Sequence, residues 1–197
     1  GAFYHDIGKM NRPAFFTENQ EGGVSPHETL DPYSSARIIL AHVTEGVEMA
    51  RKFRLPNRIQ DFINEHHGDR VVKVFYDKAR TAAGDAADEV DIDLFRYKGT
   101  RPRSRETGIV LLADTVDAAS TALRPSTAED IEKLINSLVD DHLKHGQLDD
   151  SDLTMGDIKM IRESFIETLK GRFHVRVRYP GNDELMPQPT AEAAKAP

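Results

Sequence analysis

The chain has 197 residues, a formal net charge of −7 at pH 7 and no cysteine. Its length and its 39% hydrophobic content indicate one globular domain with a sizeable core. The lack of cysteine excludes disulfides, thiolate metal sites and cysteine nucleophiles, so a metal must be held by imidazole and carboxylate groups. The negative charge argues against a large nucleic-acid surface, although a small phosphate substrate stays compatible with bound divalent ions. No apolar run approaches the roughly eighteen residues that span a bilayer, and the opening GAFYHDIGK has neither the basic start nor the apolar core of a signal peptide.

The first residues already contain a His-Asp pair, His5 and Asp6, with no preceding segment for it to pack against. We therefore expect that the chain begins inside a larger domain and that an upstream helix is missing. Residues 10 to 30 are rich in Pro, Gly, Asn and Ser, and they predict a long loop.

The first predicted helix opens at Asp31, an N-cap residue that is followed by Pro32. Apolar residues then recur at helical spacing to about Phe53. His42 falls in the middle of this helix.

A second helix is predicted to begin at Leu55-Pro56 and to stop at Gly68. This range places His66 and His67 on its last turn. The following segment, VVKVFYDKA, fits a helix or, from its β-branched residues, a strand. Its helical neighbours favour a helix.

From about Thr81 to Arg105 the chain is polar, first acidic and then basic, and this pattern predicts a mobile loop. Residues Glu106 to Leu123 are apolar on nearly all sides, so we expect a buried helix. Asp114 places a carboxylate inside that helix, which requires an explanation.

Two capping boxes predict the last two helices. Ser126 with Glu129 opens one that runs to about Lys144, and Thr154 with Asp157 opens the other. The predicted fold is therefore all-α, with at least five helices around one core.

The end of the chain combines proline, alanine and charge without periodicity. We expect a domain over residues 1–180 and a disordered tail over residues 181–197.

Imidazole and carboxylate groups gather in four separated segments of the chain. A lone helical histidine is more often a core or surface residue than a ligand, but the combination changes that weighting. These groups suit Mn, Fe, Zn or Ni, and a carboxylate can bridge two ions in sites that hydrolyse phosphate esters. Asp6 is the candidate bridge. The candidate ligands are His5, Asp6, His42, His66, His67 and Asp114.

The order H-D, H, H-H, D resembles the HD superfamily of metal-dependent phosphohydrolases. A closer resemblance is to the seven-transmembrane-receptor HD family, membrane proteins whose cytoplasmic domain hydrolyses cyclic-di-AMP. It covers Gly1 to about Pro180. The strings that carry it are FYHDIGKMNRPAFFTENQ, SPHETL, IILAHVTEGVEMARKFRLP, INEHHGDRVVKVFYDKA, FRYKGTRPRSRE and LLADTVDAA.

This resemblance implies an HD-domain helical bundle with a buried two-metal site, in the cytoplasmic domain of a bacterial plasma-membrane protein. It implies a phosphodiesterase that converts cyclic-di-AMP to linear pApA by attack of a water or hydroxide bridging two divalent ions, which we expect to be Mn or Fe. It makes the six candidates metal ligands, with Asp6 bridging. A further histidine of the superfamily lies upstream of this sequence, so we expect one ion to be under-coordinated. We also expect apolar surface at that place, covered by another segment or by a second chain in a homodimer.

Four residues are candidates for substrate contacts. Lys9 matches the lysine of the HDxxK string, which the resemblance places near the phosphate; otherwise it is an exposed lysine at a helix end. His27 belongs to the SPHETL string and lines the cleft or lies in solvent. Arg96 and Arg103 belong to a basic run that grips phosphates or is only solvated.

Three other side chains receive structural or open interpretations. His142 and His145 lie at a helix end, where the helix dipole explains them, and they are not assigned to the metals. Asp117, one turn from Asp114, is either a partner of a ligand or a carboxylate that faces water.

Two alternative functions stay open. An HD-type hydrolase of cyclic-di-GMP is disfavoured because those enzymes carry a Gly-Tyr-Pro signature after the paired histidines, whereas HHGDRVVKVFYDKA follows here. A module that binds cyclic-di-AMP without hydrolysing it is kept open by the absent upstream histidine.

Overall fold

The structure is a computed structural model, and it describes residues 1–20 and 25–173. These residues form six α-helices and several 3-10 helices, and no β-strand occurs among them, which confirms the all-α class. The predicted tail over residues 181–197 lies outside the described residues. The α-helices are α1 (Pro32–Lys52), α2 (Asn57–Glu65), α3 (Lys73–Ala83), α4 (Arg105–Leu123), α5 (Ala128–Lys144) and α6 (Met155–Arg172).

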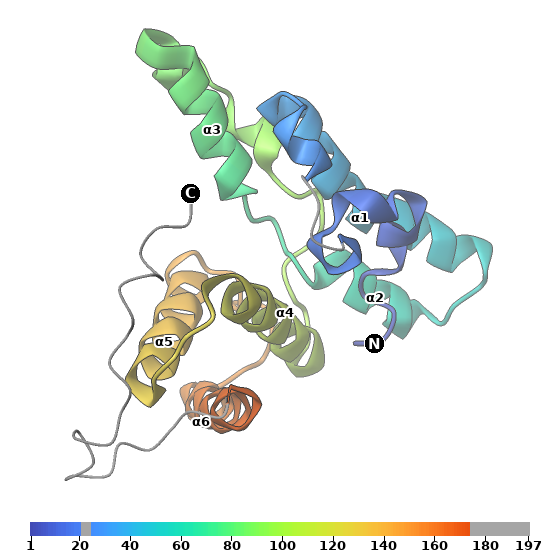
Figure 1. Cartoon of the computed structure of the whole chain (residues 1–197). Coiled ribbons are helices and arrows are strands. Elements are labelled where there is room, and N and C mark those ends of the chain that lie inside the picture. Colours follow the sequence, from blue (N-terminus) through green and yellow to red (C-terminus); the bar gives the residue numbers. More distant parts are fainter. Residues whose placement is uncertain (21–24, 174–197) are drawn as a thin grey trace, which may run out of the picture.

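The helices lie in two groups, which Figure 1 shows on either side of the centre of the molecule. The first half consists of α1, α2 and α3 with the 3-10 helices. The second half consists of α4, α5 and α6. The chain passes from one to the other through residues 96–104.

The first half is built around α1. Asp31 accepts a hydrogen bond from the backbone N–H of Ser34 at 2.9 Å, and Pro32 occupies the first turn, which confirms the predicted start of the helix. The predicted loop over residues 10 to 30 is irregular, as expected, but its described part contains short 3-10 helices. These are η1 (Ile7–Asn11), η2 (Pro13–Phe15), η3 (Thr17–Asn19) and η4 (Pro26–Glu28).

The prediction of a loop from Thr81 to Arg105 is wrong for most of that segment. The helix predicted for VVKVFYDKA is confirmed as α3, and it is followed by η5 (Gly84–Glu89) and η6 (Ile92–Phe95). The polar composition of this segment gives no sign that two of its apolar residues, Val90 and Phe95, are buried. They complete a small core with Ala36 of α1 and with Phe75 and Ala79 of α3.

The second half has a larger core, in which each helix contributes a stripe of aliphatic side chains. Its members are Leu111, Leu112, Val116, Ile131, Ile135, Val139, Leu148, Ile158 and Leu169. Burial of these aliphatic side chains holds the three helices together, because such burial is the main stabilising term in a domain of this size.

The capping boxes of the second half are largely as predicted. At α6, Thr154 and Asp157 form the reciprocal pair that the sequence indicates. At α5 the prediction is displaced by one residue, because Thr127 and Asp130 form the box in place of Ser126 and Glu129. Ser126 with Glu129 and Thr127 with Asp130 both fit the capping pattern. The helix begins at the residue after Thr127, so Thr127 is the N-cap.

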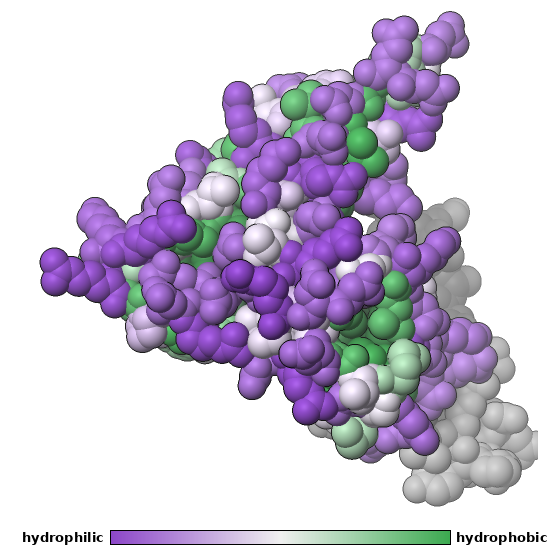
Figure 2. Space-filling view, turned by 180° about the vertical axis from the view of Figure 1, so that it is seen from behind, coloured by the Kyte–Doolittle hydropathy of each residue, from purple (hydrophilic) through white to green (hydrophobic). Residues whose placement is uncertain are grey.

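Most of the surface is hydrophilic. The view from behind shows apolar side chains in separate patches between polar ones (Figure 2). In the part of the chain that the structure describes, no helix combines the length and apolar character that crossing a membrane requires.

Candidate metal centre

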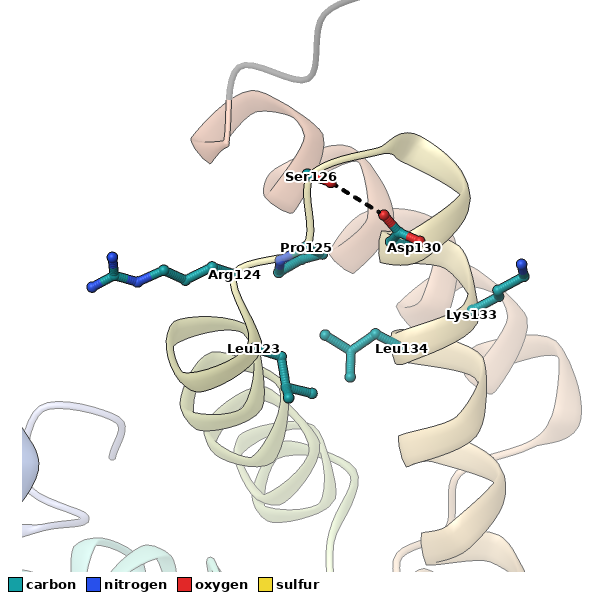
Figure 3. A pocket seen from close by; sticks show the side chains of 7 residues that line it. All are labelled: Leu123, Arg124, Pro125, Ser126, Asp130, Lys133 and Leu134. Atoms are coloured by element: carbon teal, nitrogen blue, oxygen red, sulfur yellow. Dashed lines mark hydrogen bonds between the residues drawn. The ribbon is translucent and has the colours of Figure 1, made fainter. Parts of the chain in front are cut away.

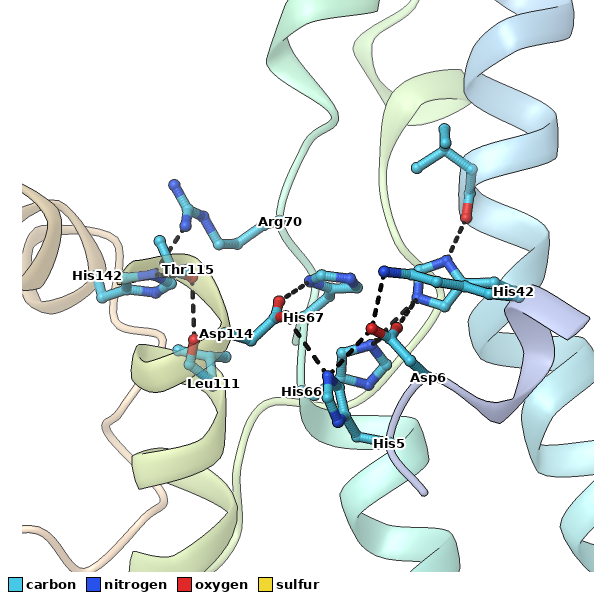
Figure 4. A network of polar contacts seen from close by, with 12 residues as sticks. His5, Asp6, His42, His66, His67, Arg70, Leu111, Asp114, Thr115 and His142 are labelled. Atoms are coloured by element: carbon cyan, nitrogen blue, oxygen red, sulfur yellow. Dashed lines mark hydrogen bonds and ion pairs between the residues drawn. The ribbon is translucent and has the colours of Figure 1, made fainter. Parts of the chain in front are cut away.

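The six predicted ligands lie together between the two halves (Figure 4). Five of them come from the first half, and Asp114 reaches across from α4. The sequence places these residues in four separate segments, so the fold itself creates the cluster.

Close backbone packing brings the N-terminal pair to α1. Gly8 in η1 lies against the carbonyl group of His42 and the backbone nitrogen of Gly46, and a Cβ at Gly8 would overlap both. Only glycine permits this approach. His5 and Asp6, which precede η1, are thereby set beside His42.

The paired histidines follow the end of α2. The helix ends at Glu65, His66 is its C-cap, and Gly68 adopts a φ of 56°, the left-handed conformation that terminates a helix. The prediction of both histidines on the last helical turn is therefore two residues too long, since His66 and His67 both follow Glu65 and lie in the turn after the helix.

Asp6 stands at the centre of the cluster, with its two carboxylate oxygens facing different partners. Its Oδ1 lies 3.3 Å from Nε2 of His42 and 3.5 Å from Nε2 of His66. Its Oδ2 lies 3.1 Å from Nε2 of His5 and 2.7 Å from Nζ of Lys9. This is the arrangement that a bridging carboxylate requires.

Asp114 closes the cluster from the other side. Its Oδ1 lies 3.4 Å from Nε2 of His5, and its Oδ2 lies 3.6 Å from Nδ1 of His67. The cluster thus offers two groups of donor atoms that share Asp6. One consists of Asp6, His42, His66 and His67, and the other of His5, Asp6 and Asp114.

The hydrogen bonds of His42 and His66 fix their tautomers. Nδ1 of His42 lies 2.5 Å from the carbonyl oxygen of Ile39, and Nδ1 of His66 lies 2.8 Å from that of Ile63. A carbonyl oxygen only accepts, so each Nδ1 carries the hydrogen and each neutral ring presents a lone pair at Nε2. The two Nε2 atoms are 3.1 Å apart. Two lone pairs at this distance repel each other unless a cation lies between them and Asp6.

Two buried polar atoms of the cluster have no hydrogen-bond partner among the described residues, Nε2 of His5 and Oδ1 of Asp6. Nδ1 of His5 faces the carbonyl oxygen of Ala2 at 2.6 Å, so in the neutral ring Nε2 is the nitrogen that presents a lone pair to the site. Buried acceptors without donors are costly, and a metal ion would satisfy them. The residues present therefore fit a metal centre of imidazole and carboxylate ligands.

The local electrostatics favour the protonation states that bind metals. Burial lowers the pKa of His42 to about 4, and burial holds the pKa of His67 well below its ordinary value. Burial opposes the charge of Asp6, but the neighbouring imidazoles and the ammonium group of Lys9 outweigh it and hold its pKa far below the usual range.

His5 is the exception. Burial disfavours its charged form, but the carboxylates of Asp114 and Asp6 outweigh burial and raise the pKa of the imidazole to about 10. A metal at this position therefore competes with a proton for Nε2 of His5.

The four candidate substrate contacts do not lie together in the structure. Lys9 stays beside the cluster, with Nζ 2.7 Å from both Asp6 Oδ2 and Glu18 Oε1. His27 packs between the rings of Phe15 and Phe75, with Nε2 3.0 Å from the Phe15 carbonyl oxygen.

The two arginines donate to protein acceptors. Arg96 donates to the carbonyl oxygen of Asp69 at 2.9 Å and to the Asp93 carboxylate at 2.9 Å. Arg103 holds Glu65, which is 1% exposed, through its backbone N–H and its Nε. Arg103 thus fastens the segment after η6 to the end of α2.

Sequence reasoning missed Tyr97, whose ring stacks on His67 with a centroid distance of 4.3 Å and an interplanar angle of 24°. Burial and the charges of Asp114 and Asp6 raise the pKa of its hydroxyl. The spacing of Phe95 and Tyr97 was the available signal, because aromatic residues two apart share one face of an extended segment. Both are buried, and an isolated bridge pairs Val71 with the intervening residue.

His142 and Asp117 have partners that the sequence does not show. His142 is fully buried in the second half, so a helix dipole at a solvated end does not explain it. Asp117 forms an exposed ion pair with Arg172 of α6, and therefore ties two helices together.

Two hollows of the described surface are lined by residues other than the candidate ligands. One of about 280 Å³ lies at the connection of α4 and α5 (Figure 3). A larger one of about 510 Å³ lies between α1 and η6, along the line of Tyr33, Arg37 and Thr44. His42 is nine residues after Tyr33, which places it on the opposite side of the helix.

The chain resembles known proteins over most of its length. Residues 1–119 match the model of the HD domain family. The chain is 39% identical over 180 residues to the cyclic-di-AMP phosphodiesterase PgpH of Bacillus subtilis and 38% identical over 184 residues to that of Listeria monocytogenes. These matches cover 91% and 93% of this chain but 25% of each relative.

Solved structures agree with this fold. The HD domain of L. monocytogenes phosphodiesterase PgpH in complex with cyclic-di-AMP superposes with a TM-score of 0.82 and is 37% identical, covering 86% of this chain and 78% of the other. A second crystal structure of that domain superposes with a TM-score of 0.79 at 38% identity, covering 87% of this chain and 79% of the other.

Proposed function

The chain belongs to the HD domain family, and from that premise we propose that it is the catalytic domain of a metal-dependent phosphodiesterase that hydrolyses cyclic-di-AMP to linear pApA. The observation that carries the proposal is the position of Asp6, shared by two groups of donor atoms. A carboxylate shared in this way is characteristic of two-metal sites that act on phosphate esters. The similarity to the PgpH enzymes supports the choice of substrate.

The proposed cofactor is a pair of divalent transition-metal ions, Mn or Fe. Such ions, when bound, activate water as a nucleophile and offset charge on the phosphoryl oxygens. His42, His66 and His67 with Asp6 would hold one of them, and His5 and Asp114 with Asp6 the other. Imidazole and carboxylate suit both metals.

Neighbouring residues of the chain hold these ligands in fixed orientations. The carbonyl groups of Ile39 and Ile63 hold the rings of His42 and His66 so that both Nε2 atoms point at Asp6. Tyr97 covers one face of His67 and prevents that ring from turning. The ligands are thereby arranged before any ion arrives.

Lys9 is the proposed phosphate contact. Its ammonium group lies 2.7 Å from Asp6, at the edge of the cluster, and the carboxylates of Asp6 and Glu18 outweigh burial and raise its pKa. A charged lysine in this position would stabilise the extra negative charge of a pentacoordinate phosphorus. The proposal does not use His27, Arg96 or Arg103, because their hydrogen bonds go to Phe15, Asp93 and Glu65 rather than to the metal-ligand cluster.

We also propose that the domain works at the cytoplasmic face of a bacterial plasma membrane. The support is the resemblance to a family of membrane proteins. The chain spans 25% of the curated relatives, so the partners and regulation of a whole protein belong to this proposal.

A turnover assay tests the function. Purified protein is stripped with chelator, reloaded with Mn²⁺ or Fe²⁺, and given cyclic-di-AMP or cyclic-di-GMP. We expect pApA to form only with metal and faster than the cyclic-di-GMP product. Binding of cyclic-di-AMP by the loaded protein without any product would identify a sensor module, and preference for cyclic-di-GMP would identify the other hydrolase.

A further inference from the structure

Asp114 is the one candidate ligand that the first half does not supply. Its carboxylate must meet His5 and His67 across the boundary between the halves. The position of α4 against the turn after α2 therefore decides whether His5, Asp6 and Asp114 can bind the same ion.

A chain of polar contacts crosses the boundary next to Asp114. Arg70, three residues after His67, donates from Nη1 to Nε2 of His142 at 2.8 Å and from Nη2 to the Asp141 carboxylate at 2.7 Å. The same Nε2 lies 3.0 Å from the hydroxyl of Thr115, the residue after Asp114. Figure 4 shows this chain beside the ligands.

The direction of the first contact is fixed by chemistry. The guanidinium of Arg70 is always protonated and only donates, so Nε2 of His142 accepts and its Nδ1 carries the hydrogen. That Nδ1 is buried and has no hydrogen-bond partner among the described residues. Burial and the charge of Arg70 lower the pKa of His142 to about 3, so the ring is a neutral acceptor.

An unsatisfied buried N–H normally destabilises a core, and a leucine of similar size would avoid that cost. His142 is fully buried yet presents an acceptor to Arg70. The contact with Arg70 accounts for the presence of a histidine at this position.

We propose that Arg70 and His142 are positioning residues, which hold α4 so that Asp114 reaches the ion it shares with His5 and Asp6. This inference rests on the proposed function, because it concerns the two-ion site. The ion held by Asp6, His42, His66 and His67 would take no ligand from α4, so we expect its binding to be unaffected by the loss of Arg70.

Arg101 provides a matched control. It also crosses between the halves, from Asp69 in the first to the carbonyl oxygen of Gly146 in the second at 3.1 Å. It touches neither α4 nor His142. If the arginines only hold the two halves together, the loss of either one should have the same effect. If Arg70 positions Asp114, only the loss of Arg70 should displace Asp114.

The experiment measures Mn²⁺ binding without substrate. Wild type, Arg70→Met, Arg70→Lys and Arg101→Met are stripped of metal and titrated with Mn²⁺, with free Mn²⁺ followed by electron paramagnetic resonance. Loss of a residue that orients a metal ligand typically weakens binding about 10- to 100-fold. We expect this loss in Arg70→Met for one of two ions, an intermediate loss in Arg70→Lys, and wild-type binding in Arg101→Met.

Melting of the metal-free proteins checks the fold, and each outcome decides the inference. Equal weakening of both ions, the same loss in Arg101→Met, or wild-type binding by Arg70→Met overturns it, as does a wild type that binds a single ion. A wild type that binds two Mn²⁺ ions but forms no pApA overturns the proposed function and leaves the role of Arg70 standing.

Discussion

The two halves of the molecule are held together by different means. The second half surrounds one cluster of nine buried aliphatic side chains with three helices. The apolar interior of the first half is divided: five buried residues, two of them alanine, form one cluster, and Val43, Ala50 and Ile63 are buried outside it. The first half instead relies on close backbone contact at Gly8, on 3-10 helices and on buried polar groups such as Glu65 and His66. The half that supplies most of the ligands is thus the half whose apolar interior is divided into smaller parts. We infer that the second half stabilises the fold, while the first half depends on satisfying its polar cluster.

The largest expected effect is the loss of the shared carboxylate. In Asp6→Ala, the lone pairs of His42 and His66 face each other and Lys9 loses its nearest acceptor, so the metal ions lose their common ligand. We expect cyclic-di-AMP hydrolysis to fall by roughly a thousandfold or more with little change in helix content. The assay compares turnover and circular dichroism with those of Asp88→Ala, an exposed control. Near-normal turnover would show that Asp6 is no ligand.

The second half can be weakened without touching the ligands. Ile135 is fully buried in α5, and Ile135→Ala should lower the free energy of unfolding by about 2–5 kcal/mol. Denaturant unfolding of the metal-free protein measures this. Met160→Ala, at a side chain that is 60% exposed, should change it by less than about 0.5 kcal/mol. If Ile135→Ala weakened Mn²⁺ binding under native conditions as strongly as Asp6→Ala, the inference that the two halves have separate roles would be wrong.

Two glycines sharpen the same comparison. Gly8→Ala places a methyl group on the His42 carbonyl, so we expect a loss of about 1–3 kcal/mol in unfolding free energy and weaker Mn²⁺ binding. Gly171→Ala, in α6 with open space around it, should stabilise the protein by about 0.5 kcal/mol through helix propensity. Stabilisation by both substitutions would mean that η1 does not pack tightly on α1.

The smallest effect concerns pH. Hydrogen bonds from Thr154 and the ion pair with Arg105 lower the pKa of Asp157 from 3.8 to about 2. A carboxyl whose folded pKa is lowered stabilises the protein above its unfolded pKa and loses that contribution as the pH falls. The stability advantage of wild type over Asp157→Asn should therefore be constant above about pH 4 and shrink towards pH 2. An advantage that stayed constant to pH 2 would contradict the lowered pKa.

Local signals predicted the helices well. Asp31 with Pro32 and Thr154 with Asp157 mark helix starts that the structure confirms, because caps act over one turn of chain. The polar stretch after α3 misled the prediction, since its composition does not show that Phe95 is enclosed by α1 and α3. Burial of a single aromatic residue depends on tertiary packing, which no local pattern contains.

The candidate site divides in the same way. The strings around His5, His42, His66 and Asp114 were sufficient to name residues that the fold brings together, while Tyr97 and Arg70 were missed. The role of Tyr97 depends on its stacking against His67, and that of Arg70 on a partner across the boundary, 72 positions further along the chain. Neither periodicity nor spacing encodes such a meeting.

The location of Asp114 on α4 has a kinetic consequence. The proposed ion between His5 and Asp114 would tie the two halves together, because they could not separate until it had dissociated. When separation limits cleavage, protease resistance follows the rate of opening more closely than equilibrium stability. The lifetime of the folded chain in the presence of protease should then be set by the rate at which this one ion dissociates. Of two metals with equal affinity, the one that exchanges more slowly should protect the connection over residues 96–104 for longer.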